Sequence, residues 1–467
     1  MPARDSWRSW LASLLASGLL AGCGDALPNS PNGPPPHERV TVRETPNERG
    51  RLERIHGQLV LFTQGTPYEE GYQHGNLLKD ELQGFYHDYY QQHVFPALPV
   101  MPEFWHAWSA RSQAAEYTPE ERAEIRGLAD GSGLSEDQIL IMQANPPWCA
   151  PATWFRSGMA GRLSFGTAAF ALSGGATLGH VPLLGMDMAG FDADVRHRYT
   201  LLQVHHPDRG YAFVVPTVPG RVMDGAGGWN ERGLVLAATE GPMRWQNASG
   251  VPSGLLTRRL IQGCGTLEEV ERGIRSVRRR SLQGLILIAA NRSGAQRFDV
   301  AQSISEAWQG RDRVVVRPAS ATGLLLASHA RNDSLALEGH LQASYGRIDV
   351  TKALQILVDT AAHTATESFS LGPWPLAKLG ATSLLASTLC DLDHDRLYVA
   401  LDRAQVESPA QFTAFDMPSL LMTAPGTPSH KVTGTVAARA SREATGRWEA
   451  GRVRVSARRG PPPWRRG

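Results

Sequence analysis

The stretch Ser164-Phe165-Gly166-Thr167-Ala168-Ala169-Phe170-Ala171 places a threonine directly after a glycine, at the start of a predicted strand. A hydroxyl at this point can attack the carbonyl of the preceding peptide bond, where glycine offers the least steric hindrance. Cleavage frees an α-amine whose intrinsic pKa of about 7.7–8.0 suits it as general base for its own side chain. The dipeptide therefore predicts a self-activating N-terminal nucleophile or, in the alternative interpretation, an ordinary strand threonine after a turn.

Motifs on both sides of this stretch extend the pattern. Downstream of it lie Gly174-Gly175-Ala176-Thr177, Gly185-Met186-Asp187-Met188-Ala189, Gly228-Trp229-Asn230-Glu231-Arg232-Gly233-Leu234 and Ser328-His329. Upstream of it lie Pro67-Tyr68-Glu69-Glu70-Gly71-Tyr72-Gln73-His74-Gly75 and Gly127-Leu128-Ala129-Asp130-Gly131. In this order, the motifs resemble the isopenicillin-N acyltransferase-like family of autoproteolytic acyltransferases and amide hydrolases. The resemblance covers about residues 57–415.

The resemblance implies a fold and an active site. The fold would be an N-terminal nucleophile αββα sandwich of the α+β class, with mostly antiparallel sheets between helical layers. Thr167, where the family has cysteine, would become the catalytic N-terminus after cleavage at Gly166–Thr167. Met186 and Ala189 stand where the family has arginine and often aspartate, and Asp187, Asp192, Asp194 or Arg196 would compensate for them.

Asn230 would help to form the oxyanion hole by the same resemblance, and such a donor is typically worth about 2.7–4 kcal/mol of transition-state stabilisation. The alternative is a turn asparagine, since asparagine tolerates positive φ. The remaining site residues are expected in the site wall, with a structural role as the alternative. They are His74, Tyr68, His329, Met186 and Arg196.

The sequence predicts no cofactor and no metal site. It contains no paired metal-ligand motif, and the histidine in Asp391-Leu392-Asp393-His394-Asp395 is typical of a polar turn. Cys149 is a rival nucleophile, but the bulky Trp148 before it disfavours self-cleavage at that point.

The N-terminus is typical of an export signal. Residues 1–23 carry early arginines, an apolar stretch too short to span a bilayer, and Leu20-Ala21-Gly22-Cys23, which resembles a bacterial lipobox. Lipidation of Cys23 would anchor the protein in the bacterial cell envelope; a plain signal peptide is the alternative. The predicted organisation continues with a Pro-rich tether over 24–51, a catalytic domain over 52–420 divided at 166/167, and a basic tail over 421–467.

Composition limits the function classes. With 42% hydrophobic residues and a net charge of +2, the chain is expected to build a sizeable core and not to bind nucleic acid. We therefore expect an exported hydrolase or acyltransferase that acts on a small-molecule amide or acyl substrate. The alternatives are a catalytically inert surface lipoprotein of the same fold and a phospholipase-B-like acyl-ester hydrolase.

Local patterns predict several elements directly. Thr66, Thr118 and Thr266 each precede residues typical of a helix start, with glutamate three positions later. Apolar runs predict strands over 57–63, 199–204, 211–217 and 234–239, and a hairpin that turns at 291–294. Helical spacing predicts a helix over 345–361.

Overall fold

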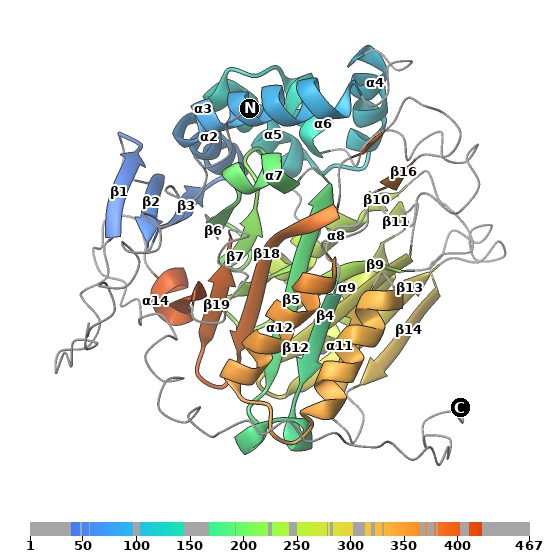
Figure 1. The fold of residues 1–467 in the computed structure, drawn as a ribbon. Helices are drawn as coiled ribbons and strands as arrows, with labels where there is room; N and C mark the ends of the chain where they lie inside the picture. Colours follow the sequence, from blue (N-terminus) through green and yellow to red (C-terminus); the bar gives the residue numbers. More distant parts are fainter. Residues whose placement is uncertain are drawn as a thin grey trace, which may run out of the picture. The chain divides into compact units, whose positions relative to one another are not determined.

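Two stacked β-sheets form the centre of the fold, with helices outside both (Figure 1). This computed structural model describes residues 39–46, 49–55, 57–96, 103–143, 168–191, 193–222, 227–241, 250–277, 279–280, 284–301, 313–318, 323–328, 331–364, 369–370, 378–379, 382–401 and 411–422. They all lie in one unit, Glu38–Gly467. Within these ranges, no helix is both long enough and apolar enough to span a bilayer.

The larger sheet has ten strands in the order β1-β2-β3-β6-β7-β8-β9-β12-β13-β14. Their bounds are β1 Arg39–Glu44, β2 Arg51–Ile55, β3 Gln58–Gly65, β6 Leu201–Pro207, β7 Phe213–Thr217, β8 Gly227–Asn230, β9 Val235–Gly241, β12 Gly284–Asn291, β13 Gly294–Ala301 and β14 Arg313–Pro318. Neighbours are antiparallel except β3 and β6, which run parallel with Val60 opposite Leu202. This pair joins the part of the chain before residue 167 to the part after it.

The smaller sheet has six antiparallel strands in the order β15-β4-β5-β18-β19-β20. Their bounds are β15 Leu324–Ser328, β4 Ala168–Leu172, β5 Leu183–Phe191, β18 Thr382–Asp391, β19 Arg396–Ala400 and β20 Thr413–Asp416. Two short pairs complete the strands: β10 Val251–Pro252 with β11 Arg279–Arg280, and β16 Phe369–Ser370 with β17 Lys378–Leu379.

Helices cover the outer faces of both sheets. Between β3 and β4 the chain forms α2 Pro67–Leu77, α3 Lys79–Phe85, the π-helical segment η1 Tyr86–Val94, α4 Glu103–Ala114, α5 Pro119–Ser132 and α6 Glu136–Gln143. After β4 lie the 3-10 turns η5 Gly174–Ala176 and η6 Leu178–His180, then α7 Ala193–Arg196, η7 His197–Tyr199, α8 Ser253–Gly263, α9 Leu267–Ser276, α11 Arg331–Ala343, α12 Val350–Thr364 and α14 Met417–Met422.

Three hydrophobic cores fill the spaces between these layers. The first joins α2–α6, α8 and α9 to the outer face of the ten-stranded sheet, through residues such as Phe85, Leu128 and Phe213. The second lies between the two sheets. The third joins the outer face of the six-stranded sheet to α11 and α12. The order helix, sheet, sheet, helix confirms the predicted αββα sandwich of the α+β class.

Three capping boxes confirm the predicted helix starts. The hydroxyls of Thr66, Thr118 and Thr266 each accept a hydrogen bond from the backbone N–H three residues later, and the glutamate there bonds back to the cap. Each cap satisfies N–H groups that a helix start leaves without a partner. The predicted hairpin at 291–294 is also confirmed.

Glycines bring α2 and α5 into backbone contact. A Cβ at Gly71 would collide with the carbonyl oxygen of Glu124, and one at Gly127 with that of Tyr68. A Cβ at Gly75 would lie 2.5 Å from the carbonyl oxygen of Leu128. Two sequence motifs that contain glycine every fourth residue therefore form one helix–helix contact.

Some predicted boundaries change. The tether predicted over 24–51 is wrong from Arg39 onward, because β1 pairs there with β2. The apolar Val40 and Val42 alternate with polar residues in this strand. The prolines on both sides of the segment led to the prediction of a tether instead. The helix predicted over 345–361 begins at Val350, after a turn at Tyr345 and Gly346. Residues 1–38 and 423–467, including Cys23, lie outside the described residues, as does Cys149.

Substituting Gly127 with alanine should destabilise the protein strongly, because the new methyl group meets the backbone of α2 and not a movable side chain. Overpacking of this kind typically costs about 1–3 kcal/mol. Thermal unfolding of Gly127→Ala measures the effect. Gly339→Ala is the control, since a Cβ on Gly339 of α11 meets nothing within 4 Å and should leave stability equal or slightly higher.

Candidate active site

The first described residue after the predicted nucleophile, Ala168, begins a strand that is paired on both sides. It lies opposite Asp187 of β5 and opposite Ser328 of β15. The antiparallel registers bring the C-terminal ends of β5 and β15 to the same end of the smaller sheet, which we call the site end. Gly166, Thr167 and His329 lie outside the described residues.

Strand alternation sends Met186 and Asp187 to opposite faces of the smaller sheet. Met186 is 3% exposed and packs between the two sheets. Asp187 is 1% exposed and shares the other face with Leu183, whose side chain packs toward α11 and α12. The hydroxyl of Ser387 on β18 donates a hydrogen bond of 2.6 Å to Asp187 Oδ1. A buried carboxyl is therefore oriented next to the start of β4.

Asn230 has a structural role in the described contacts. Its side-chain nitrogen donates to the carbonyl oxygens of Ile261 and Cys264 at 2.8 and 2.7 Å. Its side-chain oxygen accepts from the backbone N–H groups of Arg232 and Leu234. Both amide hydrogens are thus used, and the side chain is 0% exposed. Asn230 also pairs with Phe213, at the end of β7 opposite the site end. In these contacts neither amide hydrogen points to an oxyanion. Among the described non-glycine residues only His180 and Asp395 have positive φ, so the turn alternative, which rested on positive φ, does not describe Asn230 either.

His74 and Tyr68 connect parts of the helical layer. His74 Nε2 accepts a hydrogen bond of 2.9 Å from the backbone N–H of Gly220, in the loop after β7. Burial, His205 and Arg258 lower the pKa of His74 to about 3, so its imidazole is neutral. The hydroxyl of Tyr68 donates to Asp130 of α5. Both side chains therefore have structural contacts, which favours the structural alternative over a site-wall role.

Two arginines approach the site end. Arg196 follows β5, is 8% exposed, and has its guanidinium carbon 5.5 Å from the centre of the Tyr89 ring. Arg221 follows β7, and its Nη1 donates to the carbonyl oxygen of Met142 at 2.6 Å. Burial raises the pKa of the Tyr90 hydroxyl, and both arginines oppose that shift, so both lie close to Tyr90. The sequence motifs indicated only the first of these arginines.

Thr239 is a further polar residue that the motifs did not indicate as part of the site. It is 2% exposed and lies opposite Ile286, which belongs to the core between the sheets. Cross-strand partners share a face, so the Thr239 hydroxyl faces this inter-sheet layer. Val235 and Ala237 belong to the same inter-sheet core, and Thr239 follows them at the two-residue spacing of a strand. This spacing is the sequence signal that could have placed Thr239 on this face.

A buried ionic cluster lies between the helical layer and the larger sheet. Arg258 of α8 is 3.5 Å from a carboxyl oxygen of Glu124 on α5 and 4.0 Å from one of Glu70 on α2. Its Nη1 donates to Nε2 of His205 at 2.9 Å, and its guanidinium lies over the Phe213 ring. Two carboxyls thus share one guanidinium.

The ionisation of this cluster follows from its burial. Burial is the largest effect on both carboxyls and raises the pKa of Glu70 and of Glu124 to about 7, although Arg258 opposes the shift. Burial also lowers the pKa of His205 well below its usual value. A proton is therefore retained on the carboxyl pair near neutral pH.

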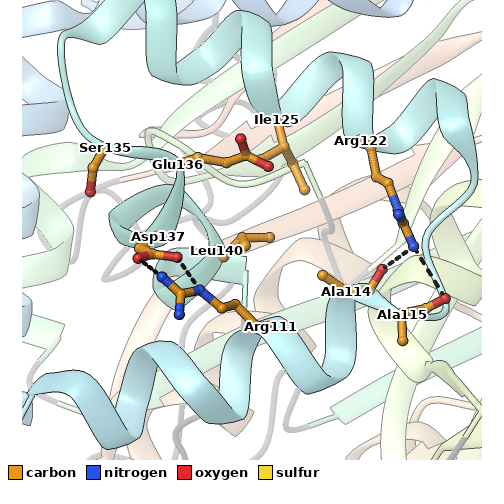
Figure 2. A pocket seen from close by; sticks show the side chains of 9 residues that line it. All are labelled: Arg111, Ala114, Ala115, Arg122, Ile125, Ser135, Glu136, Asp137 and Leu140. Atoms are coloured by element: carbon orange, nitrogen blue, oxygen red, sulfur yellow. Dashed lines mark hydrogen bonds and ion pairs between the residues drawn. The ribbon is translucent and has the colours of Figure 1, made fainter.

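A hollow of about 500 Å³ lies among α4, α5 and α6 (Figure 2). Arg111 forms a two-pronged ion pair with Asp137, and Arg122 donates to the carbonyl oxygens of Ala114 and Ala115. Its two arginines are thus already paired, and none of the predicted site residues lines it. Among the described residues, no cluster of histidine, cysteine or acidic groups has the arrangement of a metal site.

The fold is an αββα sandwich, and the candidate nucleophile Thr167 directly precedes β4, a strand of the smaller sheet that is paired on both sides. Residues 190–312 match the family model described as acyl-coenzyme A:6-aminopenicillanic acid acyl-transferase. This match confirms the resemblance to that acyltransferase family.

Individual relatives are distant. An uncharacterized protein of Archaeoglobus fulgidus is 25% identical over 359 residues. The match covers 64% of this chain, and the chain spans 58% of that relative's length. A mutant conjugated bile acid hydrolase of Clostridium perfringens is 12% identical, with 58% of this chain and 97% of that one covered and a TM-score of 0.34. Penicillin V acylase of Agrobacterium tumefaciens is 14% identical, with 57% of this chain and 98% of that one covered and a TM-score of 0.31.

The ionic cluster should make stability depend on pH. A carboxyl whose pKa is higher in the folded state stabilises the fold at low pH, and this stability is lost as pH rises through about 7. Glu124→Gln keeps the neutral form at every pH. As pH rises from about 5 to about 8, the melting temperature of Glu124→Gln minus that of the wild type should therefore increase. Glu120→Gln, on the exposed side of α5, should show no such trend.

Asn230→Ala should lower stability, because it leaves buried backbone groups without partners, each worth about 1–3 kcal/mol. Chemical denaturation measures the loss. Asn291→Ala, which removes bonds in an exposed hairpin turn, should cost less. A stable Asn230→Ala protein that has lost only turnover would restore the oxyanion role.

Proposed function

We propose that this protein is an exported N-terminal nucleophile hydrolase of linear amides, activated by cleavage between Gly166 and Thr167. The observation that carries the proposal is the position of β4, which begins at Ala168 between β15 and β5 and faces the larger sheet. Small side chains, those of Ala169, Ala171 and Ala237, face the layer between the sheets there. The family match supports the acyl-transfer chemistry.

The proposed reaction proceeds through an acyl-enzyme. The Thr167 hydroxyl attacks the amide carbonyl while its α-amine accepts the hydroxyl proton and passes it to the leaving amine. Water then attacks the ester while the α-amine takes a proton from it, and the α-amine gives that proton to the threonine oxygen as the acid leaves. Asp187, held by Ser387, lies on the neighbouring strand, where a carboxylate favours the protonated amine.

Arg221 and Thr239 supplement the residues inferred from the motifs, among which Arg196 was included. We infer that the two arginines attract an anionic group of the substrate, because both approach the site end from strand ends that face it. Thr239 would contact the acyl portion from the larger sheet. With Asn230 occupied elsewhere, the oxyanion is stabilised by groups other than its amide.

The location is also part of the proposal. The lipobox-like Leu20-Ala21-Gly22-Cys23 supports export and lipid anchoring in the bacterial envelope. Acyl-coenzyme A is scarce outside the cytoplasm, so water is the favoured acyl acceptor and hydrolysis is favoured over transfer.

Cleavage should leave both fragments in one folded unit. Strands β1–β3 precede the cleavage point, yet they belong to the same sheet as β6–β9 and β12–β14. Arg258, after the cleavage point, contacts Glu70 and Glu124 before it. Fragments should therefore separate only under denaturing conditions.

The purified wild type should give two masses under denaturing conditions, and N-terminal sequencing of the larger fragment should begin at Thr167. Thr167→Ala should remain a single chain and lack amidase activity, because the attacking hydroxyl is absent. Intact mass spectrometry makes both measurements on the same preparation.

Cys149→Ala is the control and should mature like the wild type. Single chains in both wild type and Thr167→Ala would contradict the proposal and favour the inert lipoprotein. Loss of activity in Cys149→Ala alone would identify the rival nucleophile, and fatty-acid release from phospholipid vesicles would indicate the ester-hydrolase alternative.

A further inference from the structure

Helix α4 presents its largest apolar side chains to solvent. Phe104, Trp105 and Trp108 are 64%, 45% and 62% exposed. Their spacing places them on one side of the helix, and the ring centres of Trp105 and Trp108 are 5.8 Å apart. Phe104 and Trp105 are 5.7 Å apart. We call these three residues the aromatic patch.

The buried side of α4 has smaller residues. His106, Ala107 and Ala110 are between 1% and 9% exposed and pack toward the helical layer. Burial of apolar surface normally draws the largest side chains inward, because stabilisation grows with the area removed from water. Among the described residues, the reversed arrangement in α4 therefore leaves an exposed apolar surface of the kind that binds a partner.

The chemistry of the patch fits a lipid surface. Tryptophan and phenylalanine on one face of a helix are typical of segments that lie in the interfacial region of a bilayer. The first described residue, Arg39, follows Cys23 by a short Pro-rich stretch that would keep the folded unit near an anchored membrane.

The patch belongs to the layer that covers the site end. Helix α4 packs on α6, and the segment Tyr86–Val94 of the same layer packs on α7, which follows β5 (Figure 1). Binding of this layer to a bilayer would bring the site end close to acyl amides held in the membrane.

We propose that Phe104, Trp105 and Trp108 form a membrane-docking surface that inserts into the interfacial region of a phospholipid bilayer. The inference rests on the proposed envelope location. The choice of a bilayer as the occupant rests on the proposed anchoring at Cys23, and it does not depend on cleavage at Thr167.

The test uses the chain from Gly24 onward, which lacks the apolar signal and the lipidation site but retains every described strand, helix and core. The probe is phosphatidylcholine vesicles at about 0.5 M salt, where contacts of the basic tail with lipid are screened. The protein should co-sediment with the vesicles. The triple variant F104S/W105S/W108S should bind at least about tenfold more weakly.

Leu178→Ser is the matched control. Leu178 is 59% exposed and lies between β4 and β5 at the end of the sheet opposite the site end, so its loss should not change vesicle binding. Circular dichroism and the melting temperature should show that both variants fold, and brominated lipids should quench tryptophan fluorescence in the parent more than in the triple variant.

Equal vesicle binding by the parent and the triple variant would overturn the proposal. A dimer in light scattering that disappears in the triple variant, without vesicle binding by the parent, would identify a second copy as the occupant instead. Neither outcome would affect cleavage or amidase activity, so failure of this inference is distinct from failure of the proposed function.

Discussion

The packing of the helical layer depends on the contacts of one buried group, the guanidinium of Arg258. It lies over the Phe213 ring, donates to His205, and faces the buried carboxyls of Glu70 and Glu124. Removing one partner from a buried ion pair is costly, typically about 3–5 kcal/mol, because the other charge remains buried. The glycines of α2 and α5 bring their backbones together at the same place, so the helices cannot separate to hydrate these carboxyls without losing their own contact.

This arrangement joins two parts of the sequence that the proposed cleavage would divide. Glu70, Glu124 and β3 precede residue 167, whereas Arg258, His205 and β6 follow it. The N-terminal part is therefore a component of the larger sheet and of its outer core, and not a detachable cover. Its inner side has charged groups held by the sheet, and its outer side presents the aromatic patch of α4.

The smaller sheet divides neighbouring residues between two environments. Met186 packs between the sheets, while Asp187, one residue later, faces α11 and α12 and is held by Ser387. A one-residue shift in register would exchange these positions and put a carboxyl into the apolar inter-sheet layer. The β4–β5–β18 register thus controls the chemistry next to the start of β4.

The sequence by itself determined the elements with local causes. The threonine caps, the Asn291–Gly294 hairpin turn and the alternating strands depend on neighbouring residues, and the family motifs indicated the αββα sandwich. Tertiary structure decided what depends on distant residues. The amide of Asn230 is occupied by carbonyls of Ile261 and Cys264, and Asp187 obtains its orientation from Ser387. Arg221 and Thr239 approach the site only through strand order. Packing of the whole unit sets the hydrogen-bond partners, the strand register and the burial of residues far apart in the sequence. Local sequence patterns therefore cannot predict them.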